Sequence, residues 1–327
     1  MILRKGEVQI GNSGQEVIRA RKRGAPRRSR ESPQASSCTQ KSLGQRGKSV
    51  LVAMLALAGL ASGQFMCTAA PLGLTLQWEN NILTIHSPRM PGRELKVQYL
   101  ELFCRRGSSR GSTQQEWTKS VIPHHTWIVH SRDDGSALEL ESRVGGTVRV
   151  RHEISVVADG VDFRLTLENL GGEPVDIEWG QPCVQVDRFT GLGQEHYVQR
   201  CFLFTERGLT MLNQTRRTEE ALFRGGQVYV PAGINPEDVN PRPISPDVPT
   251  KRLIGCFSED GKYLVATAWE PTQNLFQGIF VCIHNDFGIH GLTGHEIKHV
   301  RGKLYFMEND LDRLLRHYRE DFGDDGP

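Results

Sequence analysis

The sequence predicts a mostly β protein in which two large antiparallel sheets stack face to face, with one helix at the C-terminus. Two observations lead to this fold class. From about residue 70 onward, polar and apolar residues alternate in run after run, separated by short stretches rich in Gly, Asp and Asn. Helical periodicity, with apolar residues three or four positions apart, is clear only after residue 309. Many long strands favour two stacked sheets over a small barrel.

The clearest strands lie between residues 94 and 169. "ELKVQYLELFC" alternates polar and apolar positions, and "ALELESRVGGTVRVRHEISVVADGVDFRLTLEN" contains three long alternating runs. Gly145-Gly146 and Asp159-Gly160 separate these three runs, and both pairs supply the positive φ that a tight hairpin turn requires. Later runs such as "RLIGCFS", "YLVATAW" and "GKLYFM" continue the pattern. We therefore expect about thirteen strands in all.

Two segments depart from the strand pattern. Residues 231–250 contain six prolines, and we expect them to form a long extended loop over the surface of a sheet. Residues 309–322, "NDLDRLLRHYREDF", predict the helix, with Asn309 as its N-cap. One apolar stripe of this helix should pack on a sheet. The stripe contains Leu311, Leu314, Leu315 and Tyr318.

The N-terminal part differs in charge from the rest. Residues 1–50 contain twelve Lys and Arg against three acidic residues, which leaves 28 basic and 35 acidic residues of the totals of 40 and 38. The remainder is mildly acidic, so nucleic acid is not an expected partner. Lys48, an apolar run over residues 50–61 and the small residues 61–63 are the three parts of a secretory signal.

These features predict the organisation of the chain. We expect residues 1–63 to be a disordered basic extension followed by the signal, and residues 64–327 to be a single domain. The apolar run is short for a membrane span, so no stable span is expected after signal cleavage. The predicted location is secreted or periplasmic.

The seven cysteines include no CxxC pair. Cys104, Cys183, Cys256 and Cys282 lie within apolar strand-like runs, where a free cysteine behaves as a small hydrophobic side chain. An oxidising compartment would permit disulfides, but the sequence assigns no pairing.

Three stretches resemble the galactose-mutarotase-like supersandwich, the fold of aldose epimerases and many carbohydrate-processing domains. "VDFRLTLENLGGEPVDIEWGQP" resembles the strand, Asn, turn, Pro and strand passage that leads to the His-Pro pair of mutarotases. "GIFVCIHNDFG" resembles the late strand that presents the catalytic Glu, and "GLTGHEIKHVRGKLYF" resembles the loop and final strand after it. The resemblance implies a two-sheet antiparallel β-supersandwich with a carbohydrate as its ligand.

The chain departs from that family at two positions. Gln181 stands in place of the His, before Pro182, and His284 stands in place of the catalytic Glu. Gln does not titrate, whereas His titrates near neutral pH and can act as a base. Plain aldose epimerase activity is therefore not expected. The stretches "QYLELFC" and "GKLYFMENDLDRLLRHYREDF" also resemble secreted bacterial proteins of the kind seen in planctomycetes, which bring no known activity with them.

Polar residues at the end of the run "GIFVCI" are the main site candidates. His284 and Asp286 are two positions apart, so they share one face of a strand, and His290 follows in the next loop. We predict His284 and Asp286 as catalytic, with His290 and Gln181 binding the substrate. A metal such as Zn or Mn, or an ordinary strand end, are the alternatives. We assign the site to a sugar and predict no metal ligand and no cofactor.

Two further candidates come from other strands. Trp269-Glu270 closes the run "YLVATAWEP", and an aromatic ring beside a carboxylate suits a sugar by stacking and by accepting its hydroxyl groups. Arg151 shares a strand face with Arg149 and Glu153 and is predicted to line the concave face of a sheet. The structural alternatives are a core Trp at a strand end and a solvated sheet face.

His295-Glu296-Ile297-Lys298-His299 matches HExxH, the zinc-peptidase signature. Zinc peptidases carry this motif on a helix, which places both imidazoles on one face. Here Thr293-Gly294 precedes it and Gly302 follows it, and the residues between them run into "KLYFM" as a strand. On a strand the two imidazoles are about 13 Å apart, too far for one metal ion.

The leading hypothesis is a secreted protein that binds or processes a carbohydrate. The first alternative is a non-catalytic cell-envelope or partner-binding module, which the missing mutarotase pair suggests. The second is a zinc peptidase that uses the HEIKH motif. The sequence does not decide whether the chain is an enzyme, which sugar it binds or what its oligomeric state is.

Overall fold

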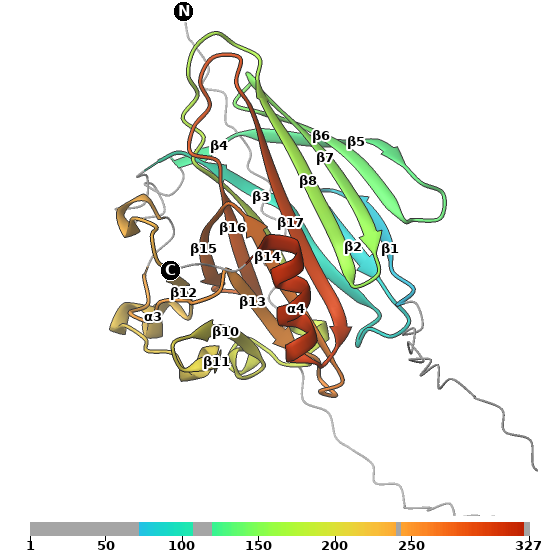
Figure 1. The fold of residues 1–327 in the computed structure, drawn as a ribbon, viewed down its shortest axis with the longest axis vertical. Coiled ribbons are helices and arrows are strands. Elements are labelled where there is room, and N and C mark those ends of the chain that lie inside the picture. The colour runs from blue at the N-terminus through green and yellow to red at the C-terminus, as the bar shows by residue number, and fades with distance from the viewer. Residues whose placement is uncertain (1–71, 107–119, 240–242, 324–327) are drawn as a thin grey trace, which may run out of the picture. The chain divides into compact units, whose positions relative to one another are not determined.

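Two antiparallel sheets stack face to face in the computed structural model, which describes residues 72–106, 120–239 and 243–323 (Figure 1). This confirms the predicted fold class. The described residues form seventeen strands, more than the thirteen or so expected. Several of the additional strands contain only two to four residues, which is too short for alternation to show.

The first sheet, sheet A, has the strand order β1-β2-β3-β9-β16-β15-β12, with β4 paired to β3. Its strands are β1 (Thr75–Glu79), β2 (Ile82–His86), β3 (Glu94–Cys104), β4 (Val121–Ile122), β9 (Trp179–Gln185), β12 (Gln227–Tyr229), β15 (Thr272–Gln277) and β16 (Cys282–Gly288). Strands far apart in the sequence, β9 and β16, are neighbours at its centre.

The second sheet, sheet B, has the order β11-β10-β13-β14-β17-β8-β7-β6-β5. Its strands are β5 (His124–Ser131), β6 (Ala137–Val144), β7 (Val148–Val157), β8 (Gly160–Asn169), β10 (Cys201–Thr205), β11 (Gly208–Met211), β13 (Leu253–Phe257), β14 (Tyr263–Glu270) and β17 (Ile297–Glu308). The two predicted hairpins are present, since β6 pairs with β7 and β7 with β8. Gly145 and Gly146 have φ of 58° and 85°, as the first turn requires.

Short helices fill some of the connections. They are α2 (Asp187–Thr190), α3 (Glu219–Arg224), and the 3₁₀ turns η1 (Tyr197–Gln199), η2 (Leu212–Gln214) and η3 (Pro236–Asp238). The sequence predicts only the C-terminal helix, because elements of three to six residues are too short to show a helical period.

The predicted C-terminal helix is α4 (Leu311–Phe322), which packs on the outer face of sheet B (Figure 1). Leu314 and Tyr318 of the predicted stripe are buried there, and Leu311 and Leu315 are partly buried. The N-cap is Asp310 and not the predicted Asn309. The Asp310 carboxylate accepts the Arg313 N–H at 2.9 Å, whereas the Asn309 amide donates to the Gly261 carbonyl.

The main hydrophobic core lies between the two sheets. The Phe287 ring of β16 packs on the Trp269 ring of β14, with centroids 4.9 Å apart, and Trp269 packs on Phe163 at 5.3 Å. Asn285, on the same side of β16 as Phe287, donates to the carbonyls of Arg252 and Thr267. This orientation determines the site, because the alternate residues of β16 must face away from the core.

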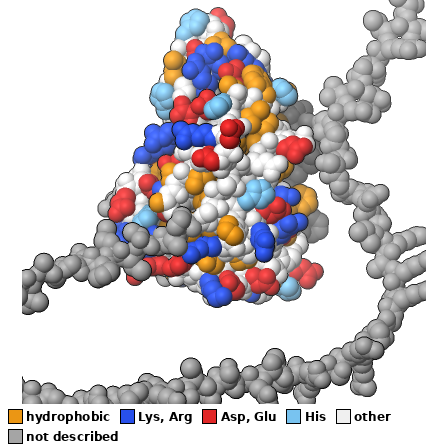
Figure 2. Space-filling view, turned by 90° about the vertical axis from the view of Figure 1, so that its right-hand side faces the viewer, with side chains coloured by type: hydrophobic (Ala, Val, Ile, Leu, Met, Phe, Trp, Pro, Cys, Tyr) orange, Lys and Arg blue, Asp and Glu red, His pale blue; other side chains and the backbone are white. Residues whose placement is uncertain are grey.

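The described part of the loop over residues 231–250 lies on the outer face of sheet A. Ile234, Val239 and Ile244 pack with Val228 of β12 and Phe276 of β15. This agrees with the predicted surface loop. Charged side chains of both signs are interspersed on the molecular face that Figure 2 displays.

The basic extension and the signal-like segment over residues 1–63 lie outside the described residues, as do Cys38 and Cys67. The described residues all belong to one unit of the chain, Met66–Pro327. Among them, no helix has both the length and the apolar character needed to cross a membrane. The predicted signal and location remain predictions.

Candidate functional site

A cluster of buried polar side chains lies at the centre of sheet A, on the face turned away from the core. Successive side chains of β16 point to opposite faces of the sheet. Cys282, His284 and Asp286 therefore share this outer face, while Ile283 and Phe287 lie in the core. His284 is 3% exposed and Asp286 is 0% exposed. Strands β9 and β15 flank β16 on its two sides and complete the cluster.

Two amide side chains hold the Asp286 carboxylate. The Nε2 atom of Gln181, on β9, donates to Oδ2 of Asp286 at 3.2 Å, and the Nδ2 atom of Asn274, on β15, donates to the same oxygen at 2.8 Å. Burial raises the pKa of Asp286 to about 7, although the nearby His284 and both amides act in the opposite direction. The structure thus brings together three predicted site residues, Gln181, His284 and Asp286.

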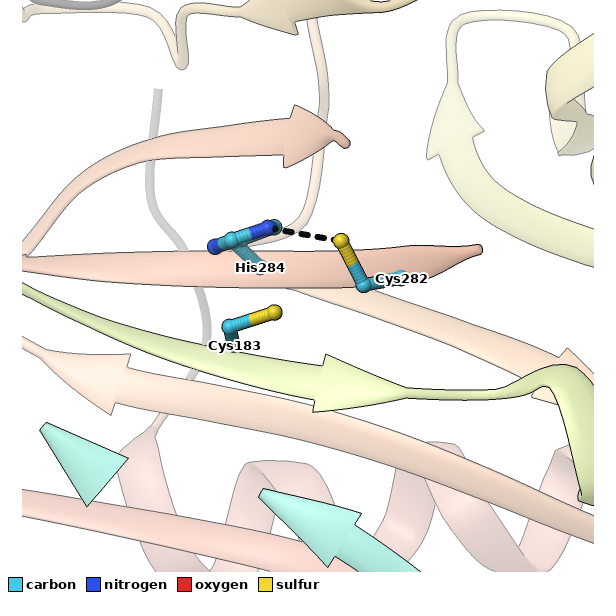
Figure 3. A group of neighbouring side chains, drawn as sticks. All are labelled: Cys183, Cys282 and His284. Atoms are coloured by element: carbon cyan, nitrogen blue, oxygen red, sulfur yellow. Dashed lines mark hydrogen bonds between the residues drawn. The ribbon is translucent and has the colours of Figure 1, made fainter. Parts of the chain in front are cut away.

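Two cysteines adjoin His284 on the same face (Figure 3). The Nε2 atom of His284 lies 3.1 Å from Sγ of Cys282, and Cys183 reaches the pair from β9. A hydrogen bond with Cys183 lowers the pKa of the Cys282 thiol against the effect of burial, and the charge of His284 acts in the same direction. Burial alone would lower the pKa of His284, but the negative charge of Cys282 outweighs it and raises the pKa to about 9. The arrangement favours a thiolate beside an imidazolium.

Three polar atoms of the cluster have no hydrogen-bond partner among the described residues. They are Nδ1 of His284, Oδ1 of Asp286 and Oδ1 of Asn274. The nearest approach between the first two is 4.0 Å, which is too long for a hydrogen bond. A buried polar atom without a partner costs about 1–3 kcal/mol, so several in one place indicate a site.

Glu101 of β3 lies at the edge of the same cluster. Burial raises the pKa of its carboxyl, while the positive charge of His284 and a hydrogen bond with Cys183 act in the opposite direction. Glu101 is partly exposed, so it connects the buried cluster with the surface.

The structure places the predicted aromatic and acidic pair elsewhere. Trp269 is buried in the core between the sheets, against Phe163 and Phe287, so its ring does not reach the outer face of sheet A. Glu270 is exposed at the end of β14 and forms an ion pair with Arg301 at 2.6 Å. Trp269 is therefore a core residue at the end of a strand, which is the structural alternative to a sugar-stacking role.

Arg151 and His290 also lie apart from the cluster. Arg151 shares one face of β7 with Arg149 and Glu153, as predicted, but that face is the outer face of sheet B, where Glu168 lies 3.8 Å from it. His290 follows β16, and its Nδ1 lies 2.9 Å from a carboxylate oxygen of the buried Glu178. Burial raises the pKa of Glu178, but hydrogen bonds from His290 and Arg106 outweigh it and lower the pKa overall.

The HEIKH segment forms a turn and the start of β17, not a helix. His295 has φ of 60° in the turn, and Glu296 accepts from the backbone N–H of Thr293 at 2.7 Å. The Lys298 ammonium donates to the carbonyls of Ile289 and Gly291 at 2.9 and 2.7 Å. The segment closes a turn and does not assemble a zinc-peptidase site, as the sequence indicated.

Replacing both His295 and His299 with alanine is therefore expected to leave any zinc content unchanged. Both histidines are exposed, and Nδ1 of His299 lies 3.2 Å from Oγ1 of Thr166, so the free energy of unfolding should fall by less than about 1 kcal/mol. Metal analysis and urea unfolding of the double variant check this. Loss of bound zinc would restore the peptidase hypothesis.

Sequence reasoning missed Cys183, Cys282 and Asn274. A signal for one of them was present, because Cys282, His284 and Asp286 occur at every second position and must share a face of any strand. Cys183 likewise lies two residues after Gln181. Both cysteines were interpreted as small hydrophobic side chains because apolar residues surround them in the sequence.

Comparisons with known proteins find no matching family model and no matching curated protein. Several solved structures are similar in fold. An alpha-N-acetylgalactosaminidase from Bifidobacterium bifidum has 12% identity and a TM-score of 0.44, and the match covers 78% of this chain and 39% of that enzyme. A galactose mutarotase-like protein from Lactobacillus casei has 9% identity and a TM-score of 0.38, with 72% and 100% covered.

A galactose 1-epimerase from Lactobacillus acidophilus has 10% identity and a TM-score of 0.34, with 72% of this chain and 97% of that enzyme covered. Galactose mutarotase-like proteins, the superfamily that the sequence resembles, are thus among the similar structures. At TM-scores below 0.5, these likenesses assign neither an activity nor a site to this chain.

Proposed function

We propose that this chain binds a carbohydrate on the outer face of sheet A, over the cluster formed by Gln181, Asn274, His284 and Asp286. The observation that carries the proposal is the group of three unpartnered buried polar atoms on these side chains. The sequence resemblance to galactose-mutarotase-like proteins supports the same ligand class.

Sugar hydroxyl groups match the chemistry of these atoms. Each hydroxyl donates one hydrogen bond and accepts others, so it can donate to Oδ1 of Asp286 or of Asn274. A protonated Nδ1 of His284 can donate to a hydroxyl or ring oxygen of the sugar. Gln181 and Asn274 already hold the other carboxylate oxygen, which fixes the direction of the free one.

The same atoms are placed to act on the bound sugar. Oδ1 of Asp286 is the group best oriented to exchange a proton with a hydroxyl, because Oδ2 is occupied by the two amides. His284 supplies a second hydrogen-bonding group 4.0 Å away. Since these side chains are almost fully buried, a sugar reaches them only when neighbouring side chains such as Phe276, whose ring centroid is 5.0 Å from that of His284, change position.

The test is binding of the full chain to a glycan array, followed by calorimetry with the sugars that bind. At least one sugar should bind saturably, and Asp286→Asn and Gln181→Leu should each weaken its affinity by about tenfold or more, the loss expected when a buried hydrogen bond to a ligand is broken. An NMR assay for anomer conversion or cleavage of the bound sugar then tests whether Asp286 is catalytic.

Arg151→Ala and Glu270→Gln are the matched controls, because both residues looked like sugar ligands in the sequence but lie on sheet B. They should leave the affinity unchanged. No sugar binding at all, or binding that Asp286→Asn does not weaken, would contradict the proposal and favour the non-catalytic partner-binding module.

We also propose that the chain is exported, because residues 48–63 resemble a secretory signal. N-terminal sequencing of the mature protein tests this proposal.

A further inference from the structure

Cys183, Cys282 and His284 offer one nitrogen and two sulfur atoms that all lie within 4.8 Å of one another. Figure 3 shows two of the side chains on β16 and the third on the neighbouring β9. The cysteines are 6% and 4% exposed and His284 is 3% exposed. Within the part of the chain that the structure describes, this is the one group of Cys, His and acidic side chains with its donor atoms so close together.

The spacing of these atoms suits a tetrahedral metal ion. Zinc bonds of about 2.3 Å to sulfur and 2.0–2.1 Å to nitrogen place neighbouring donors roughly 3.6–3.8 Å apart in a tetrahedron. The Cys282 and His284 donors are 3.1 Å apart, so a small side-chain rotation would open the pair to that separation. The two sulfur atoms make the set soft, which selects zinc or copper(I) over magnesium or calcium.

We propose that Cys183, Cys282 and His284 bind one thiophilic metal ion, zinc(II), and leave its fourth coordination position to a water molecule or a ligand. This proposal does not depend on the proposed sugar function. Two cysteines and one histidine with an open position are a known arrangement for catalytic zinc, in contrast to the closed four-ligand sets of structural sites.

Three features of the fold support a built site. The ligands stand on adjacent central strands, where His284 pairs directly with Cys183 in the register, so their backbones are held rigidly. Asp286 lies 4.0 Å from Nδ1 of His284, and a small shift of either side chain would let this carboxylate accept a hydrogen bond that orients a metal-bound histidine. Gly278 lies against the donors, and a Cβ there would overlap with Sγ of Cys282 and approach Nε2 of His284 to 3.2 Å.

A second pair of buried cysteines in the chain serves as a control for the proposed site. Cys201 and Cys256 are also free, buried and on paired strands, in register with each other in sheet B. No histidine or carboxylate joins them in a group of three donors among the described residues. A variant at Cys256 therefore removes a buried thiol without touching the proposed site.

The first experiment measures zinc directly. The full chain, reduced and then equilibrated with zinc chloride, should retain about one zinc per molecule after desalting, and so should Cys256→Ser. Cys183→Ser and Cys282→Ser should each weaken zinc affinity by at least tenfold in a competition assay with a chelating dye. With cobalt(II) in place of zinc, the near-ultraviolet band from thiolate to cobalt should fall by about half in each Cys→Ser variant.

Gly278→Ala is the second variant, because it keeps all three ligands and fills the space beside them. It should lose tight zinc binding while circular dichroism shows a folded β protein, which separates loss of the site from loss of the fold. Two results would overturn the proposal: reduced wild type that retains no zinc, or a Cys183→Ser/Cys282→Ser double variant that still retains it. No sugar is present in these measurements, so their failure is distinct from failure of the proposed function.

Discussion

Gly160→Ala is expected to lower the free energy of unfolding by about 4 kcal/mol or more, enough to leave a marginally stable domain largely unfolded. Gly160 begins β8 at the hairpin with β7, and a Cβ at this position would overlap with the backbone carbonyl oxygen of Leu304 on β17. Backbone cannot rotate away as a flexible side chain can, so the two central strands of sheet B would have to separate. Its φ of 155° adds strain for any residue with a side chain.

Gly146→Ala is the matched control for this effect. Gly146 also lies in a hairpin turn with positive φ, at 85°, but a Cβ there meets no atom within 4 Å. Only the backbone strain remains, about 1–2 kcal/mol. Urea unfolding followed by tryptophan fluorescence measures both variants, and equal losses would contradict the role given to the contact with Leu304.

Asp159→Asn is expected to cost about 3 kcal/mol of stability at pH 7, the cost of breaking a buried ion pair from one side. The Lys303 ammonium lies 2.9 Å from Asp159 and 2.9 Å from Asp321, which belongs to α4. Asp159 is 5% exposed and Lys303 is 7% exposed. Without the Asp159 charge, Asp321 is the closest remaining carboxylate that balances the buried Lys303 ammonium. The contact between α4 and sheet B is therefore weakened.

The dependence of this loss on pH follows from the pKa shifts. Burial raises the pKa of Asp159, but hydrogen bonds from His317 and Lys303 outweigh it and hold the pKa below the ordinary value of 3.8. A depressed carboxyl pKa stabilises the fold above the unfolded pKa and loses that contribution as pH falls through the folded pKa. The difference between wild type and Asp159→Asn should therefore stay constant from about pH 5 to 9 and shrink below about pH 4.

Lys303 sets the upper limit of that window. Burial lowers its pKa, but hydrogen bonds to Asp159 and Asp321 raise it overall above 10.5. Its contribution is complete below the unfolded pKa and is lost only as pH rises through the higher folded value. Asp162→Asn is the control, since burial raises the pKa of Asp162 and its charge is not favoured by the fold. That variant should cost little at pH 7, and a loss as large as that of Asp159→Asn would contradict the account.

Much of the fold could be predicted from local patterns. Alternation of polar and apolar residues identified the long strands, because in a strand it depends only on successive side chains facing opposite sides. Gly145-Gly146 and Asp159-Gly160 located two hairpins for the same kind of local reason, the need for positive φ. The short strands β4, β11 and β12 could not be predicted in this way, because they are held by pairing with longer neighbouring strands and not by a pattern of their own.

The candidate site shows where local patterns stop. Spacing alone placed His284 and Asp286 on one face of one strand, and it would have placed Cys282 with them. Spacing does not predict which face of β16 meets the core. Both faces of this strand are buried, and each carries polar as well as apolar residues. The core packing of Phe287 on Trp269 decided it, and the same packing removed Trp269 from the site.

By itself, the sequence determined the fold class, the C-terminal helix and the common face of His284 and Asp286, since each of these depends on residues close together along the chain. Only the tertiary structure decided which residues meet them. The strand order β9-β16-β15 brings Gln181 to Asp286 across 105 positions and places Cys183 beside Cys282. Such long-range pairing depends on how whole strands pack and leaves no local periodicity from which it can be predicted.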